Sequence, residues 1–125
     1  MHIFRRICLA VMIVVVNGAA LCEPPPIVCT ASIDPGLTVR VTDARTGEGV
    51  MGATVTATDG DYVEVLDPPG SSSGSHVGAY ERPGTYTLTI EAQGYVSQTI
   101  EDVVVERGVC HVHMVWRTVE LTPAS

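Results

Sequence analysis

The sequence predicts an all-β protein, built as a single β-sandwich of about seven short strands with Greek-key connections. From residue 37 to residue 121, short segments alternate apolar with polar residues, which is the period of a half-buried strand. Glycine, proline, aspartate and serine residues separate these segments at short intervals. No long stretch after the first 22 residues has helical periodicity. Many short strands joined by turns are typical of an all-β sandwich or barrel.

The first half of the predicted domain contains three strands. Apolar residues alternate with polar ones in residues 37–43 and again in residues 53–58, and Thr46-Gly47-Glu48-Gly49 is expected to turn the chain between them. Asp59-Gly60 predicts a two-residue hairpin turn, because both central positions of that turn prefer positive φ. The partner strand of this hairpin is expected at residues 62–65.

The second half of the domain begins with a long loop. Residues 67–75 contain two prolines and a run of glycine and serine, so we expect a mobile surface loop with nothing to bury. In the longest alternating segment, Tyr86, Leu88 and Ile90 are expected to face the core. The remaining strand regions are expected at residues 76–81, 85–92, 95–106 and 109–121.

The N-terminus has the features of a secretory signal. Arg5 and Arg6 precede an apolar run at residues 7–16, and small residues follow near residue 20. A transmembrane helix needs about 20 apolar residues, so this run favours a cleaved signal helix over a permanent span. We therefore expect residues 1–22 to be a signal peptide and the protein to be exported, as a periplasmic protein, a cell-envelope lipoprotein or a secreted protein.

The rest of the chain divides into a linker and one domain. Residues 23–35 are rich in proline, and residues 36–122 form the predicted β-sandwich domain. Without the signal, the chain has five arginines, no lysine and fourteen acidic residues, a net charge near −9. Such a surface repels phosphate, which argues against nucleic-acid binding and against adhesion to anionic lipid through charge alone. Membrane contact is expected only through a lipid anchor.

The cysteines predict one disulfide. Cys8 lies in the signal, and an exported protein meets an oxidising compartment, so Cys29 and Cys110 are natural partners. This bond would tie the start of the domain to its last strand and stabilise the fold by about 4 kcal/mol. Cys22 remains as a lipidation site, because residues 19–22 loosely resemble a lipoprotein cleavage site. Leu21 departs from that pattern, and ordinary cleavage near Ala20 or Cys22 is the alternative.

The order of several short motifs resembles a known family. These motifs are a first strand that ends in Asp43, a Thr46-Gly47 turn, Gly52-Ala53-Thr54-Val55, Pro83-Gly84-Thr85-Tyr86 and Gly94-Tyr95. Together, across residues 36–121, they resemble the carboxypeptidase regulatory-like domain of exported bacterial proteins. That resemblance implies a transthyretin-like, or prealbumin-like, β-sandwich. In zinc carboxypeptidases a similar domain is an appendage to the catalytic domain, and elsewhere such domains are spacers, adhesion modules or binding modules. The resemblance therefore implies the fold and leaves the function open.

Two late histidines raise the possibility of a metal site. Residues two apart on a strand face the same way, so His111 and His113 would present two imidazoles, with His76 or an acidic residue as a third ligand for zinc or copper. The alternative, which we favour, is that both histidines face solvent on an outer strand. The opposite face would then enter the core, with Cys110, Val112, Met114 and Trp116. We accordingly expect no metal and no cofactor.

The sequence offers no convincing catalytic site. Cys110 and His111 are adjacent on the predicted strand and so face opposite ways, which prevents the histidine from serving the thiol. Tyr86 and Tyr95 are expected to pack, which leaves Tyr62 and Tyr80 as candidate binding residues. We therefore expect a non-catalytic exported module that binds a protein or glycan partner, or an accessory or structural envelope protein. The alternative function is a metal-binding or metalloenzyme-like site at His111 and His113.

Overall fold

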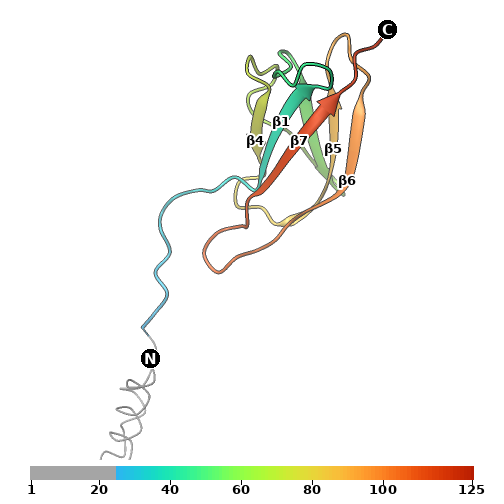
Figure 1. Ribbon diagram of the computed structural model, residues 1–125. Coiled ribbons are helices and arrows are strands. Elements are labelled where there is room, and N and C mark those ends of the chain that lie inside the picture. Colours follow the sequence, from blue (N-terminus) through green and yellow to red (C-terminus); the bar gives the residue numbers. More distant parts are fainter. Residues whose placement is uncertain (1–24) are drawn as a thin grey trace, which may run out of the picture.

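A computed structural model describes residues 25–125 of the chain. It contains seven strands in two sheets, which confirms the all-β sandwich (Figure 1). The signal helix predicted for residues 1–22 lies outside the described residues, as does Cys22. No helix within residues 25–125 is long and apolar enough to cross a membrane. The strands are β1 (Leu37–Asp43), β2 (Thr54–Asp59), β3 (Tyr62–Val65), β4 (Ser75–Gly78), β5 (Gly84–Glu91), β6 (Gln98–Val105) and β7 (Val115–Leu121).

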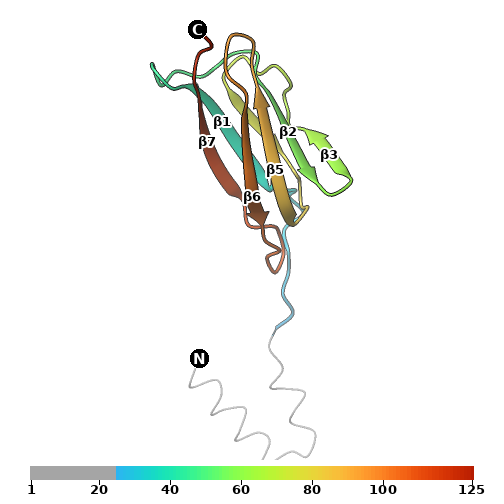
Figure 2. The same ribbon diagram turned by 90° about the vertical axis from the view of Figure 1, so that its right-hand side faces the viewer.

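The two sheets face each other across one core. One sheet has the strand order β4-β1-β7 and the other has the order β3-β2-β5-β6. Figure 2 shows the two sheets edge on, with β7 beside β6 at one side of the sandwich and β3 at the far edge of the larger sheet. The first and last strands pair in parallel, with Leu37 opposite Val115 and Asp43 opposite Leu121. The end of the sandwich at which the chain enters β1 is therefore also the end at which β7 begins.

Alternation along the strands produces the core. Leu37, Val39 and Val41 of β1 are fully buried between the sheets. Tyr86, Leu88 and Ile90 of β5 are buried from the opposite sheet, which confirms the prediction for residues 85–92. Burial of each such side chain contributes about 1.5–3 kcal/mol, so this interdigitated layer is the main source of stability.

The predicted hairpin is present but its turn lies one residue later than expected. Asp59 pairs with Tyr62, so the two central residues of the turn are Gly60 and Asp61. Gly60 has φ +60°, whereas Asp61 is not among the described residues with positive φ. A glycine at the first central position alone is typical of a type II′ turn, which explains the shift.

The loop at residues 67–75 is packed against the sandwich. Ser71 is 2% exposed, so the expectation that this loop has nothing to bury was wrong. The carbonyl of Gly74 accepts a 2.7 Å hydrogen bond from the backbone N–H of Val41. A Cβ on Gly74 would lie 2.6 Å from the carbonyl oxygen of Val41. The glycines and serines of this loop therefore allow close backbone approach to β1.

The motifs that suggested the family have structural roles. The carboxylate of Asp43 accepts hydrogen bonds from the backbone N–H groups of Arg45 and Thr46 and from the hydroxyl of Tyr95. This arrangement fixes the turn after β1 and fastens it to the connection between β5 and β6. Gly47 has φ +75°, a conformation that glycine adopts without strain.

Arg82 and Tyr86 form a second structural cluster. The Tyr86 hydroxyl donates to the backbone carbonyl of Arg82 at 2.7 Å, and Arg82 Nη1 lies 3.0 Å from Asp59 Oδ2. The Arg82 guanidinium carbon lies 3.7 Å from the centroid of the Tyr62 ring. Tyr62 also donates to Glu64, and mainly for this reason its pKa is raised to about 12. Tyr62, predicted as a binding residue, is thus occupied in holding the β2–β3 hairpin against β5.

Candidate functional site at the entry end of the sandwich

The segment before the last strand is a tight loop. Strand was predicted across residues 109–121, but β7 begins only at Val115. Arg107 pairs with Val112, and the backbone N–H of Gly108 donates to the carbonyl of His111 at 2.9 Å. A Cβ on Gly108 would lie 2.2 Å from that same carbonyl oxygen, so the turn requires glycine. His111 and His113 therefore do not share a strand face as expected.

The predicted disulfide joins this loop to the start of the described chain. Cys29 and Cys110 are bonded, and their Cα atoms lie 5.2 Å apart. The bond reaches the loop before β7 and not the strand itself. Because the two cysteines are 81 residues apart, the bond closes most of the domain into one covalent ring.

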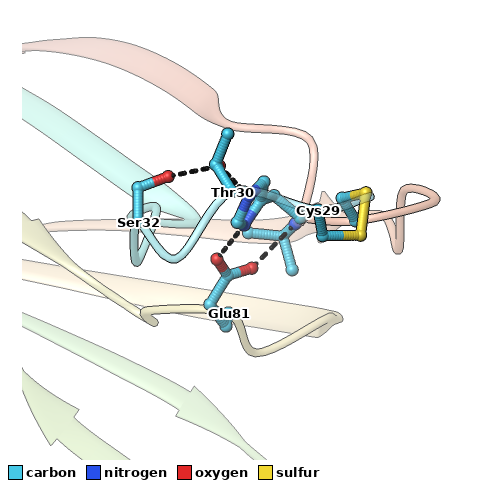
Figure 3. The surroundings of a disulfide bond; sticks show 7 residues. Cys29, Thr30, Ser32 and Glu81 are labelled. Carbon is cyan, nitrogen blue, oxygen red and sulfur yellow. Dashed lines mark hydrogen bonds and ion pairs between the residues drawn. A yellow bond between two sulfur atoms is a disulfide. The ribbon is translucent and has the colours of Figure 1, made fainter. Parts of the chain in front are cut away.

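Glu81 is the centre of a polar cluster beside the disulfide (Figure 3). Its Oε1 accepts the backbone N–H of Val112 at 3.1 Å, and its Oε2 accepts the backbone N–H of Asp34 at 3.0 Å. The same Oε2 lies 2.5 Å from Nδ1 of His111. On the other side of the imidazole, Nε2 lies 2.9 Å from Oγ1 of Thr30. We call Thr30, Asp34, Glu81, His111 and the Cys29–Cys110 bond the latch.

The backbone brings Glu81 into this position through an uncommon conformation. Ala79 has φ +52° and Glu81 has φ +49°, a region that residues other than glycine rarely occupy. The N–H of Glu81 also donates to the carbonyl of Asp34 at 3.0 Å, which completes a two-way backbone bridge. Strained residues of this kind persist where surrounding contacts hold them, and here those contacts are the bonds of the latch.

Glu81 and His111 stabilise each other's charged forms. The backbone N–H of Asp34 and the imidazole of His111 hold the pKa of Glu81 below its usual value. The hydrogen bond to Glu81 raises the pKa of His111 above its ordinary 6.5, against a smaller opposing effect of burial. The pair is therefore an anionic carboxylate with an imidazole that gains a proton readily.

The three histidines of the described residues do not form a metal site together. His113 is exposed, with Nδ1 4.0 Å from Oε2 of Glu106. His76 is fully buried, and neither of its ring nitrogens has a hydrogen-bond partner. Burial lowers the pKa of His76, and the nearby backbone of Pro68 opposes that shift. His76 is thus a neutral core residue and does not act as the third ligand of the predicted metal site.

Three other side chains are better placed to bind a metal ion than the three histidines. Asp34, Glu81 and His111 each offer a ligand atom, and these atoms lie within 4.8 Å of one another. Glu81 Oε2 and His111 Nδ1 are already hydrogen-bonded to each other, however. A cation would have to replace the proton between them, and the raised pKa of His111 opposes the loss of that proton.

The latch also has the order of groups found in hydrolase triads. A hydroxyl (Thr30), an imidazole (His111) and a carboxylate (Glu81) follow one another at hydrogen-bond distances. Each bond joins a different pair of chain segments, so the relay fastens the N-terminal segment to the two loops beneath it. A cavity of about 380 Å³ adjoins the relay, lined by Ser32, Glu81 and residues 107–112.

Sequence reasoning missed most of the latch. Thr30 and Asp34 lie in the predicted linker, and Glu81 lies two residues before a family motif whose role is packing. No local pattern connects these residues with His111, because the contacts span 30 to 81 positions. The cysteine pairing was the one available signal, since it places residue 29 beside residue 110.

The aromatic residues divide differently from the prediction. Tyr86 and Tyr95 pack as expected, whereas Tyr80 remains 46% exposed and stays a candidate contact residue. Trp116 was expected in the core and is instead 68% exposed. Met114 and Cys110 were also expected on the buried face, and both are exposed; only Val112 of that set is buried.

Fold and latch together define a small, disulfide-linked β-sandwich module. The chain belongs to the carboxypeptidase regulatory-like domain family, whose model matches residues 36–111. This is a regulatory-like, non-catalytic domain family. The comparison with curated proteins gave no match.

One solved structure similar to this chain is the crystal structure of a proposed carbohydrate-binding protein from Bacteroides uniformis. The two are 14% identical with a TM-score of 0.48, and the match covers 72% of this chain and 43% of that chain. The present chain thus corresponds to less than half of that protein.

Proposed function

We propose that the protein is a non-catalytic, exported module that acts by binding a protein or glycan partner at the cell envelope. Residues 1–22 serve as its export signal, with Cys22 as the site of lipid attachment when the chain is anchored. A disulfide between Cys29 and Cys110 is consistent with a location outside the cytoplasm, where such bonds persist. Residues 23–28 then form the link between the anchor and the domain.

The observation that carries the non-catalytic assignment is the bonding of the latch. Glu81 accepts three hydrogen bonds and both ring nitrogens of His111 have partners. The two described cysteines are bonded to each other. These bonds hold three segments together, and two of the three hydrogen bonds to Glu81 come from backbone N–H groups. Such bonds to the backbone favour a structural role.

A partner is best accommodated on β3. Figure 2 shows β3 at the edge of the larger sheet. In this strand Val63 and Val65 are 64% and 45% exposed. At the other edge of the same sheet, β6 carries a bulge at Glu101 and Asp102, and Asp102 has φ +60°. Charge and a bulge on an edge strand discourage pairing with another chain. The apolar pair on β3 lacks such protection and suits a partner strand or an apolar partner surface.

Two variants of the mature protein test this proposal. Val63→Asp with Val65→Asp should abolish capture of the envelope partner by immobilised protein, because the changes place two charges in the contact. Val104→Asp, at an exposed position on β6, is the matched control and should leave capture unchanged. Hydrolysis of esters or peptides by the purified protein that disappears in Thr30→Ala would overturn the non-catalytic assignment.

The grouping of Asp34, Glu81 and His111 favours one second candidate, a metal site at the latch. It differs from the site predicted at His111, His113 and His76, since only His111 belongs to both. Stoichiometric zinc or copper in the purified protein, lost in His111→Ala and retained in His113→Ala, would support this candidate.

A further inference from the structure

The exposed apolar side chains gather at one end of the sandwich. Twelve large apolar residues are exposed in residues 25–125, and seven of them belong to three segments that meet at the end where the chain enters: the N-terminal segment, the β4–β5 connection and residues 109–116. We call this surface the entry face. It comprises Ile27, Val28, Ile33, Tyr80, Val109, Met114 and Trp116.

Specific bonds place these residues together. The disulfide joins the residues that follow Val28 and Val109, whose exposures are 86% and 81%. Tyr80 precedes Glu81, which is bonded to His111 in the latch. The N–H of Val115 donates to the carbonyl of Gly36 at 2.8 Å, which holds the start of β7 beside the start of β1. Figure 1 shows the N-terminal segment and the loop before β7 at the same end.

The charge of the entry face differs from that of the rest of the domain. The segments 25–33 and 103–119 contain one acidic residue, Glu106, although the whole sequence has fourteen. The same segments contain Arg107 and Arg117, and no ion pair between either arginine and a described acidic residue is formed within 4.0 Å. Of the other acids at this end, Asp34 and Glu81 belong to the latch. Asp59 is paired with Arg82, Glu64 accepts hydrogen bonds from Tyr62 and from the N–H of Ala79, and Asp61 lies in the β2–β3 turn.

The described chain enters β1 at this end of the sandwich. The sequence that precedes it contains the apolar run at residues 7–16 and Cys22. Six residues lie between Cys22 and Cys29, and an extended chain over those seven Cα–Cα steps spans at most about 25 Å. An anchor at Cys22 would therefore hold the entry face close to the bilayer, with the proline-rich stretch as a stiff connection.

We propose that the entry face docks on a lipid surface, an inference that rests on the proposed export of the domain. Tyr80 and Trp116 lie at the level of the headgroups, where amphipathic aromatic rings are favoured. Val28 and Val109 enter the boundary of the acyl chains. Arg107 and Arg117 face lipid phosphates, and each strengthens binding to anionic lipid about fivefold. The opposite end of the domain, with Asp43, Glu48 and Glu91, faces away from the membrane.

The single tryptophan makes this arrangement directly measurable. The full chain is bound to vesicles of phosphatidylcholine and phosphatidylglycerol in which the phosphatidylcholine carries bromine on its acyl chains. Docking predicts strong quenching of Trp116 fluorescence by the brominated lipid and protection of Trp116 from iodide in solution. All variants share residues 1–24, so an anchor contributes equally to the vesicle binding of each. The quantity measured is the depth of Trp116 in the bilayer and not the amount of protein bound.

Matched variants separate docking from anchoring. Val28→Asp with Val109→Asp should remove most of the quenching by lipid, because charges replace two apolar contacts without changing buried residues. Met51→Asp, at a 74% exposed position at the opposite end, should leave it unchanged. The proposal is overturned if the wild-type chain sediments with vesicles but iodide still quenches Trp116 fluorescence and the brominated lipid does not. Protection of Trp116 that requires an added envelope protein overturns it as well. Neither result bears on the partner site at β3.

Discussion

The carboxylate of Glu81 accepts a hydrogen bond from the imidazole of His111, thirty residues further along the chain. The same carboxylate accepts the backbone N–H groups of Asp34 and Val112. One side chain therefore joins the N-terminal segment, the β4–β5 connection and the loop before β7. Because Glu81 has partners in three segments, we expect its side chain to hold these segments together.

Replacement of Glu81 by glutamine should loosen the latch without unfolding the sandwich. The amide is neutral and one of its two terminal atoms is a donor, so it cannot serve all three hydrogen-bond donors. Amide hydrogen exchange at Asp34 and Val112 should accelerate severalfold, whereas exchange in β5 should not change. Glu91→Gln, an exposed position on β5, is the control. Unchanged exchange at both amides would show that the carboxylate does not hold these segments.

Removal of the disulfide should lower stability strongly. In the loop-entropy account, a bond between residues 81 apart contributes about 4 kcal/mol. The double variant Cys29→Ser, Cys110→Ser should therefore unfold at a much lower urea concentration, and reduced wild-type protein should match it. Equal urea midpoints for the reduced and oxidised wild type would contradict this expectation.

Replacement of Tyr95 by phenylalanine should weaken the domain in a pH-dependent way. The Tyr95 hydroxyl is the main cause of the lowered pKa of Asp43. A lowered carboxyl pKa stabilises the folded state above the ordinary value of 3.8, and the benefit is lost as pH falls. The urea midpoints of wild type and Tyr95→Phe should therefore differ most near neutral pH and converge in acid. A difference that is constant across this range would exclude Asp43 as the cause.

Replacement of His76 by leucine should stabilise the protein, most of all in mild acid. The folded state keeps His76 neutral because burial lowers its pKa, whereas the unfolded chain takes up a proton below about 6.5. Stability is thus fully present above that pH and is lost as pH falls through it. Leucine also removes two unsatisfied buried nitrogens, so we expect a gain of about 1–3 kcal/mol at pH 5. Urea unfolding at pH 5 and pH 8 measures both effects, and a destabilised variant at pH 5 would contradict them.

Local patterns predicted the strands because alternation is a property of neighbouring residues. The β1 bounds and the inward positions of Tyr86, Leu88 and Ile90 follow directly from a period of two. Hairpin position was predicted to within one residue, since the turn type depends on the φ preference of Gly60.

The error at Trp116 has a specific cause. A continuous strand through residues 109–121 would have placed the even-numbered residues in the core. The loop before β7 interrupts this alternation of buried and exposed residues, and within β7 the odd-numbered Val119 and Leu121 are buried instead. A shift of one residue moves every side chain to the other face, so Trp116 became an exposed residue. The latch escaped prediction for a different reason, since its members meet only when β1, β5 and β7 are assembled.

Histidine NMR across a pH titration, with and without one equivalent of zinc, tests the structural role of the latch most directly. The account predicts that His111 titrates above its ordinary value of 6.5, that His76 titrates below it, and that zinc leaves the His111 signals unchanged. Titration of His111 at or below 6.5, together with loss or shift of its signals at one equivalent of zinc, would show that this residue is a free metal ligand and would contradict the account.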